Sequence, residues 1–86
     1  METRNGESTV MYLIQFGNYR VYDNAKKMLS AVRQNGINAV MSYNGIFFYV
    51  VSKSFEDSCT ALFVCDVMSK KNKRFAYSFV RKTDSF

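Results

Sequence analysis

The segment NAVMSYNGIFFYVVS, residues 38–52, decides the fold of this chain. Its Asn44-Gly45 pair is a strong hairpin signal, because both residue types tolerate the positive φ angles of a tight turn between antiparallel strands. Residues 46–52 are mainly aromatic and β-branched, which is typical of a strand, and residues 38–43 form a second strand-like run. These two runs are therefore predicted to be antiparallel neighbours in a sheet.

Upstream of the hairpin, the sequence predicts one strand and one helix. Residues 11–16, MYLIQF, place polar Gln15 between two apolar residues, as in a half-buried strand. Gly17-Asn18 is expected to end that strand, Asp23 to cap the following helix, and Asn35-Gly36 to stop it. The buried face of this helix follows a spacing of i, i+3, i+4 and i+7 and consists of Ala25, Met28, Leu29 and Val32.

Downstream of the hairpin, the same units recur. Ser54 and Asp57 have the spacing of a capping box and predict a helix to about Lys71, and residues 74–82 predict a last strand. With an offset of 36 residues the two halves match in phase. The matched pairs are Tyr12 with Phe48, Ile14 with Val50, Tyr19 with Phe55, Ala25 with Ala61, Met28 with Val64, Leu29 with Cys65, and Val32 with Met68. This pattern indicates an internal duplication.

The resulting order, βαββαβ, predicts an α+β protein with a ferredoxin-like, RNP-like fold. Four antiparallel strands should form one sheet, with both helices on one face and the first and third strands at the centre. The domain is expected to cover residues 10–82, after a disordered lead or linker at residues 1–9 and before a C-terminal tail at residues 83–86.

The face of the sheet that lacks helices is predicted to carry Leu13, Gln15, Phe47 and Tyr49. An exposed patch of apolar and aromatic side chains usually marks a binding surface. Rings beside a side-chain amide suit ligands with flat faces, such as sugars or nucleobases. The alternative is that the linker, the C-terminal tail or a second copy of the chain covers this face.

Composition excludes most enzymatic chemistry. The chain has 86 residues, no His, no Trp and only two Cys. A Ser-His or Cys-His nucleophile pair is therefore impossible, and the thiols are too few for a structural zinc site. We expect no enzyme activity, no cofactor and no metal, and we expect Cys59 and Cys65 to be reduced and buried. The sequence predicts neither a membrane span nor a signal peptide, so we expect any secretion signal, membrane anchor or enzyme domain to lie in the parent chain outside this fragment. The net charge of +5 favours acidic partners or polyanions.

Several motifs resemble those of the SPOR domain, the sporulation-related repeat of bacterial cell envelopes. They are YLIQFGNY at residues 12–19, Asn24-Ala25, Leu29, GINA at residues 36–39, and FYVVSKSF at residues 48–55 with Ala61 six residues later. The resemblance extends over about residues 11–82. It implies a non-catalytic module that binds peptidoglycan glycan strands lacking stem peptides, usually at division septa, and hence a periplasmic or cell-envelope location.

The resemblance also implies which residues contact the glycan. Gln15 matches the family residue in the first strand. Asn18 stands where the family has Ser, and Tyr49 where it often has Arg. Together with Leu13 and Phe47, these residues are the predicted glycan-binding site.

Two other readings of the sequence stay open. RNA-recognition domains share the βαββαβ order and place aromatic residues on the first and third strands, and NGIFFYVVS at residues 44–52 resembles their third-strand signature. A single-stranded RNA is therefore an alternative partner. The third reading is a ferredoxin-like regulatory or interaction module without a polymer ligand.

Overall fold

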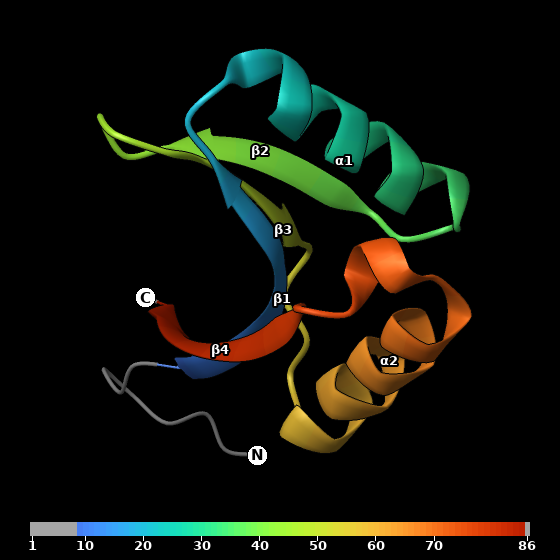
Figure 1. Cartoon of the computed structure of the whole chain (residues 1–86). Helices are drawn as coiled ribbons and strands as arrows, with labels where there is room; N and C mark the ends of the chain where they lie inside the picture. Colours follow the sequence, from blue (N-terminus) through green and yellow to red (C-terminus); the bar gives the residue numbers. More distant parts are fainter. Residues whose placement is uncertain (1–8, 86) are drawn as a thin grey trace.

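Residues 9–85, which the computed structural model describes, form a four-stranded antiparallel sheet with both helices on one side and none on the other (Figure 1). The elements are β1 (Thr9–Tyr19), α1 (Tyr22–Gln34), β2 (Ala39–Tyr43), β3 (Phe48–Ser52), α2 (Ser58–Lys71), the 3-10 helix η1 (Lys73–Phe75) and β4 (Phe79–Ser85). The strand order β2-β3-β1-β4 places β1 and β3 at the centre. The predicted α+β fold is confirmed.

The hairpin between β2 and β3 forms where Asn44-Gly45 predicts it. Gly45 has a φ of 97°, a conformation that favours glycine. The Asn44 Oδ1 accepts hydrogen bonds from the backbone N–H groups of Ile46 at 2.9 Å and Phe47 at 2.8 Å. The Asn44 N–H also donates to the Phe47 carbonyl at 3.2 Å, so the turn spans Asn44 to Phe47 and β3 begins two residues later than we expected.

Both helices begin at residues other than the expected caps. α1 begins after Val21, and Asp23 lies inside its first turn, where a carboxylate still favours the positive end of the helix dipole. α2 begins after Asp57, so Asp57 and not Ser54 is the cap. Its carboxylate accepts hydrogen bonds from the Thr60 hydroxyl at 2.6 Å and the Thr60 N–H at 3.0 Å. These two bonds lower the pKa of Asp57.

The segment after α2 differs most from the prediction. We expected a strand from Arg74, but Lys73–Phe75 forms η1 and β4 begins only at Phe79. The Asn72 side chain starts this turn by accepting a hydrogen bond from the Arg74 N–H at 2.9 Å. The turn brings the Phe75 ring into the core. An extended strand that began at Arg74 would place this ring differently.

The ends of the domain also differ from the expectation. β4 pairs with β1 as far as Thr9 and Ser85, so residues 83–85 belong to the sheet and not to a tail. Thr9, which we assigned to the lead, begins β1. The rest of the expected lead, residues 1–8, and Phe86 lie outside the described residues.

The core lies between the helices and the sheet and follows the predicted repeat. Ile14 and Val50 are both fully buried, and so are Ala25 and Ala61. The core cluster consists of Ile14, Phe16, Ala25, Met28, Ala31, Val32, Ala39, Val50, Cys65, Met68 and Phe75, with Leu29, Val64, Tyr19 and Phe55 among the residues packed against it. Equivalent positions of the two halves therefore face the same interior.

The two cysteines differ in their surroundings. Both thiols are free, but only Cys65 is buried, and the exposed position of Cys59 corrects the expectation that both lie in the core. Six residues correspond to about one and two-thirds turns of an α-helix, so Cys59 is rotated away from the buried stripe. Burial, with a smaller contribution from Asp66, raises the pKa of the Cys65 thiol.

This difference predicts the outcome of thiol labelling. With an alkylating reagent under native conditions, Cys59 should react quickly and Cys65 only after denaturation, because the thiolate is the reactive species and burial disfavours it. Mass spectrometry of the labelled protein measures both sites. A Cys59→Ser variant that is still labelled quickly without denaturant would show that Cys65 is not in the core.

Candidate functional site

The side of the sheet without helices carries all five residues of the predicted site. We call this surface the open sheet face. It consists of Leu13, Gln15, Asn18, Val40, Ser42, Phe47, Tyr49, Val51, Phe79 and Arg81. The register places Gln15 opposite Val51 and Asn18 opposite Tyr49. Residues directly opposite each other in an antiparallel pair share one face of the sheet, so these side chains are neighbours.

Asn18 reaches the open sheet face because β1 contains a β-bulge. The register of β1 on β3 shifts between Gln15 and Gly17, which leaves Phe16 as the extra residue. Strict alternation would turn Asn18 toward the helices, together with Phe16. The bulge reverses the alternation after Phe16, whose ring enters the core. The expectation that Gly17-Asn18 ends the strand was therefore wrong: the strand continues to Tyr19.

Gly17 suits this bulge because the Tyr19 side chain lies against it. A Cβ atom at position 17 would come within 2.6 Å of the Tyr19 hydroxyl. Burial of this side chain raises the pKa of Tyr19, against an opposing effect of the Arg74 charge. Tyr19 itself is opposite Phe48, on the helix side of the sheet.

The Gln15 side chain is at the centre of a polar line across β1 and β4. It is only 4% exposed. Its Oε1 accepts a hydrogen bond from Arg81 Nη1 at 2.8 Å, and its Nε2 donates to Asn18 Oδ1. Both ends of the amide are thus engaged within the protein. Gln15 orients Arg81 and Asn18, which are exposed, and presents little surface of its own.

Two arginines accompany the aromatic rings. The Arg81 guanidinium carbon lies 6.0 Å from the centroid of the Tyr49 ring, and that of Arg20 lies 5.3 Å from the centroid of Phe47. Both are distances at which a ring attracts a cation. The open sheet face therefore combines flat apolar surfaces with guanidinium donors beside them.

The hairpin holds the Tyr49 ring in place. Asn44 Nδ2 donates a hydrogen bond to the Tyr49 hydroxyl at 2.5 Å, while the Oδ1 of the same side chain shapes the turn. Tyr49 is partly buried, with Val51 two residues along β3 and Asn18 opposite it on β1. Asn44 thus both shapes the hairpin turn and holds the Tyr49 ring in place on the open sheet face.

Sequence reasoning missed Arg81 as a residue of this face and Arg20 as a residue at its edge. Arg81 lies within the strand that we predicted at residues 74–82, and its partner on β1 is Leu13. The predicted central place of the first strand requires a second neighbour for it, but the register was needed to show that this neighbour is β4 and that Arg81 lies on the open side. Arg20 follows β1, where a longer strand than predicted carries it to the edge of the face.

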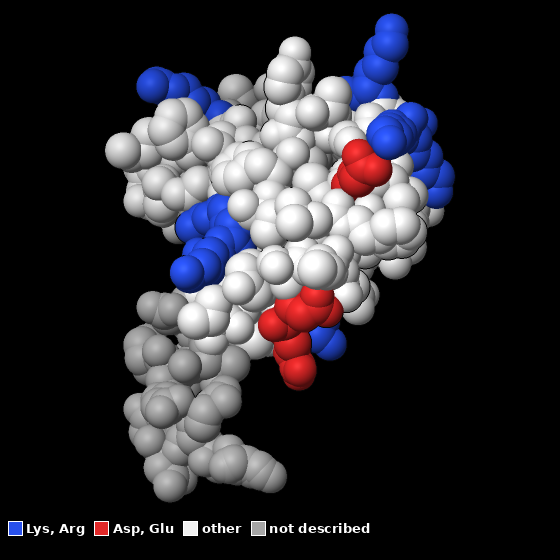
Figure 2. All heavy atoms as spheres, turned by 90° about the horizontal axis from the view of Figure 1, so that it is seen from below, with Lys and Arg blue, Asp and Glu red and all other residues white. Residues whose placement is uncertain are grey.

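Charge is spread over the molecule. Viewed from the side of α2 and β4, basic side chains stand at several separate places, with acidic side chains at fewer places between them (Figure 2). The residues that define the open sheet face include Arg81 and no carboxylate. The face is thus mildly cationic, which favours neutral or acidic ligands.

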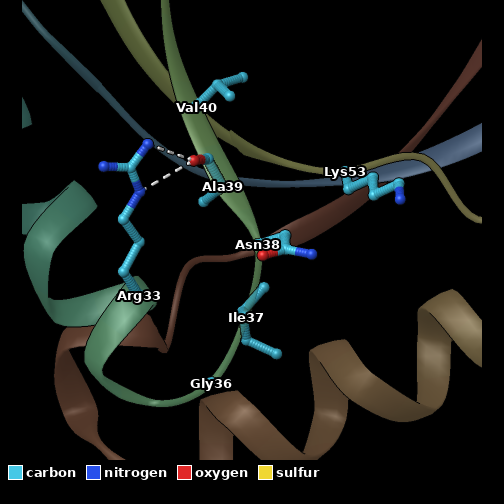
Figure 3. A pocket seen from close by; sticks show the side chains of 7 residues that line it. All are labelled: Arg33, Gly36, Ile37, Asn38, Ala39, Val40 and Lys53. Atoms are coloured by element: carbon cyan, nitrogen blue, oxygen red, sulfur yellow. Dashed lines mark hydrogen bonds between the residues drawn. The ribbon is translucent and has the colours of Figure 1, made fainter.

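Apart from the open sheet face, a hollow of about 670 Å³ lies at the outer edge of β2 (Figure 3). Arg33 points from α1 to the Ala39 carbonyl and donates to it from Nε at 3.1 Å and Nη2 at 3.0 Å. The Lys53 N–H donates a hydrogen bond to the Asn38 carbonyl at 2.9 Å, so this carbonyl points toward β3. Successive carbonyls of a strand point to opposite sides, so the Ala39 carbonyl points away from β3 and accepts its hydrogen bonds from Arg33. The lining residues are Arg33, Gly36, Ile37, Asn38, Ala39, Val40 and Lys53. They include no aromatic ring, so this groove offers a sugar fewer contacts than the open sheet face.

Within residues 9–85 no three His, Cys, Asp or Glu side chains come together as metal ligands. In the same part of the chain, no helix has the length and hydropathy needed to cross a membrane.

Comparison with known proteins agrees with this architecture. A family model described as SPOR domain matches residues 9–82. The solution structure of the peptidoglycan binding domain of the B. subtilis cell wall lytic enzyme CwlC superimposes with a TM-score of 0.68 at 15% identity, covering 96% of this chain and 99% of that chain. At this identity the likeness shows the fold alone. No curated protein sequence matches the chain.

Proposed function

This chain belongs to the SPOR domain family, and we propose that its open sheet face binds the glycan strands of peptidoglycan. One observation carries the proposal: Gln15 holds Arg81 and Asn18 at the surface in a polar line, and the Tyr49 ring lies opposite Asn18 on β3. Aromatic faces pack against the C–H faces of sugar rings, and guanidinium and amide groups bond their hydroxyl and acetamido groups. The domain of the CwlC enzyme, which shares the fold, is described as peptidoglycan binding.

The roles within the site differ from those that the resemblance implies. We assign direct contact with the sugar to Arg81, Asn18, Tyr49 and Phe47, and a positioning role to Gln15, because its amide is engaged at both ends. Arg81 lies over the ring at position 49, where the family often has Arg. In this chain the guanidinium near position 49 therefore comes from β4.

We further propose that the domain prefers glycan strands without stem peptides. The open sheet face extends across neighbouring strands of a curved sheet, with Val51 opposite Gln15 and Tyr49 opposite Asn18 (Figure 1). A bare strand can lie along such a surface, whereas peptide branches would hold it away from the rings. On this basis the module has no catalytic step of its own and directs a cell-envelope protein to such strands, as at division septa.

Co-sedimentation with peptidoglycan sacculi tests the proposal. We expect the protein to pellet with sacculi that an amidase has stripped of stem peptides, and far less with untreated sacculi. A parallel experiment with single-stranded RNA tests the RNA-binding alternative. Equal pelleting with both kinds of sacculi would disprove the preference, and binding to RNA without pelleting on either would disprove the glycan function.

A further inference from the structure

The outward surface of α2, on the far side of the helix from its buried stripe, is apolar along most of its length. Leu62, Phe63 and Val67 are 56%, 69% and 45% exposed, and Cys59 is exposed beside them. Phe63 and Val67 are four residues apart, so their side chains lie one above the other on the same face of the helix. This is a cluster of large apolar groups in water, unlike the single exposed hydrophobic residues that every protein has.

Positive charge follows this surface along the chain. Lys70 and Lys71 form the last turn of α2, and Lys73 and Arg74 follow in η1. Lys70 is seven residues after Phe63, which places it on the same face of the helix. Residues 56–77 contain these four cations and three carboxylates, with Glu56 and Asp57 at the start of α2 and Asp66 within it.

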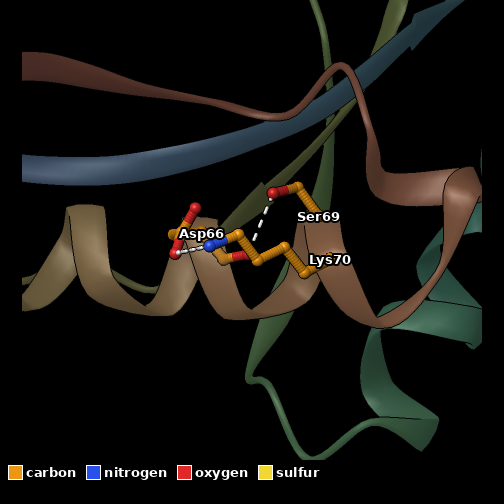
Figure 4. A network of polar contacts seen from close by, with 3 residues as sticks. All are labelled: Asp66, Ser69 and Lys70. Carbon is orange, nitrogen blue, oxygen red and sulfur yellow. Dashed lines mark hydrogen bonds and ion pairs between the residues drawn. The ribbon is translucent and has the colours of Figure 1, made fainter.

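Asp66 offsets only part of this charge (Figure 4). Its Oδ2 lies 3.2 Å from Lys70 Nζ, with the two side chains 59% and 77% exposed. An ion pair as exposed as this is weak and is screened by salt. The Ser69 hydroxyl turns back to donate to the Asp66 carbonyl at 2.9 Å. The surface is therefore apolar in its first half and basic at its end.

We propose that the outward surface of α2 docks on a bilayer that contains anionic phospholipid. Phe63, Val67 and Leu62 would enter the boundary between headgroups and acyl chains, while Lys70 and Lys71 contact lipid phosphates. An anionic polymer would need only the cations, and a neutral protein partner only the apolar groups. α2 is about 21 Å long and carries both apolar and basic side chains on its outward surface. This combination matches the chemistry of a membrane surface that contains anionic lipid.

This inference does not rest on the proposed glycan function. α2 packs on the side of the sheet opposite the open sheet face (Figure 1). The domain can therefore hold a glycan strand on one side and a bilayer on the other. Variants of α2 should pellet with stripped sacculi as the parent does, so that failure of one proposal is separable from failure of the other.

Vesicle sedimentation with the full chain tests the docking. Mixed phosphatidylcholine and phosphatidylglycerol vesicles should bind the protein at low ionic strength, and vesicles of phosphatidylcholine alone much less. Lys70→Gln with Lys71→Gln should weaken binding by roughly fivefold per lysine, since each basic side chain near an anionic surface contributes about 1 kcal/mol. Phe63→Ala with Val67→Ala should weaken it by roughly tenfold or more through lost apolar contact.

The chain offers a matched control for each change. Lys26→Gln with Lys27→Gln removes the same charge from α1, and Val21→Ala with Ile46→Ala removes exposed apolar groups near the other end of the sheet. Both should bind vesicles within about twofold of the parent, and circular dichroism should show that every variant is folded. Because the chain has no Trp, Phe63→Trp adds a single indole that can be excited apart from the six Tyr, and its emission should shift to the blue on anionic vesicles.

Three results would overturn the proposal. They are a parent protein that binds neither kind of vesicle, an equal loss of binding in the α1 and α2 lysine variants, and full binding by Phe63→Ala with Val67→Ala, which would indicate attraction to anions alone. A dimer in solution that Phe63→Ala with Val67→Ala abolishes would instead assign the surface to a second copy of the chain.

Discussion

Replacing Phe75 with alanine is expected to lower the free energy of unfolding by about 3–5 kcal/mol, the usual cost of removing a buried aromatic ring. Phe75 is fully buried and is among the largest buried side chains of the protein. Its ring meets that of Phe16 edge to face, with centroids 5.9 Å apart and an interplanar angle of 70°. The cavity left behind would lie between α2, η1 and β1, where rigid elements cannot close over it.

For a domain of this size, that loss corresponds to a fall of roughly 15 °C or more in the thermal midpoint. Since small domains have only about 5–15 kcal/mol of stability, a measurable fraction of the variant should be unfolded at ambient temperature. Tyr77→Ala is the matched control, because Tyr77 is two residues away and 90% exposed, and it should leave the midpoint almost unchanged. Equal midpoints for Phe75→Ala and the parent would mean that this ring is not part of the core.

Arg81→Ala should weaken binding to stripped glycan strands by roughly tenfold to a hundredfold, since hydrogen bonds to a charged group contribute about 1.5–3 kcal/mol. Two effects combine in this variant. The guanidinium over Tyr49 is lost as a donor to the ligand, and the Gln15 Oε1 loses the partner that fixes it at 2.8 Å. Because Arg81 is exposed, the fold should survive the change. Affinity and thermal midpoint should be measured on the same samples.

Lys82→Ala is the control for charge. It removes one positive charge from the next residue, but Lys82 is opposite Tyr12 and so lies on the other face of β4. Its affinity should stay within about twofold of the parent. Arg81→Lys should recover only part of the loss, because an ammonium group lacks the planar set of donors of a guanidinium. If Arg81→Ala and Lys82→Ala weaken binding equally, the contribution of Arg81 is general attraction and not contact.

The features that the sequence predicted correctly depend on neighbouring residues or on simple periodicity. Asn44-Gly45 determines its own turn, and the spacing of Ala25, Met28 and Val32 selects the buried face of α1 whatever packs against it. The repeat of these spacings around Ala61 and Cys65 does the same for α2. Since alternation in a strand follows from backbone geometry, Gln15 and Tyr49 were also assigned to the correct side of the sheet.

The sequence by itself thus determined the order of the elements, the central position of β1 and β3, and the face on which Leu13, Gln15 and Tyr49 lie. The tertiary structure alone decided how Asn18 and Arg81 join them. The bulge at Phe16 turns Asn18 to the open sheet face, and the place of Arg81 depends on the register between β1 and β4. Bulge and register are set by contacts between residues far apart in the chain, for which a local pattern holds no information.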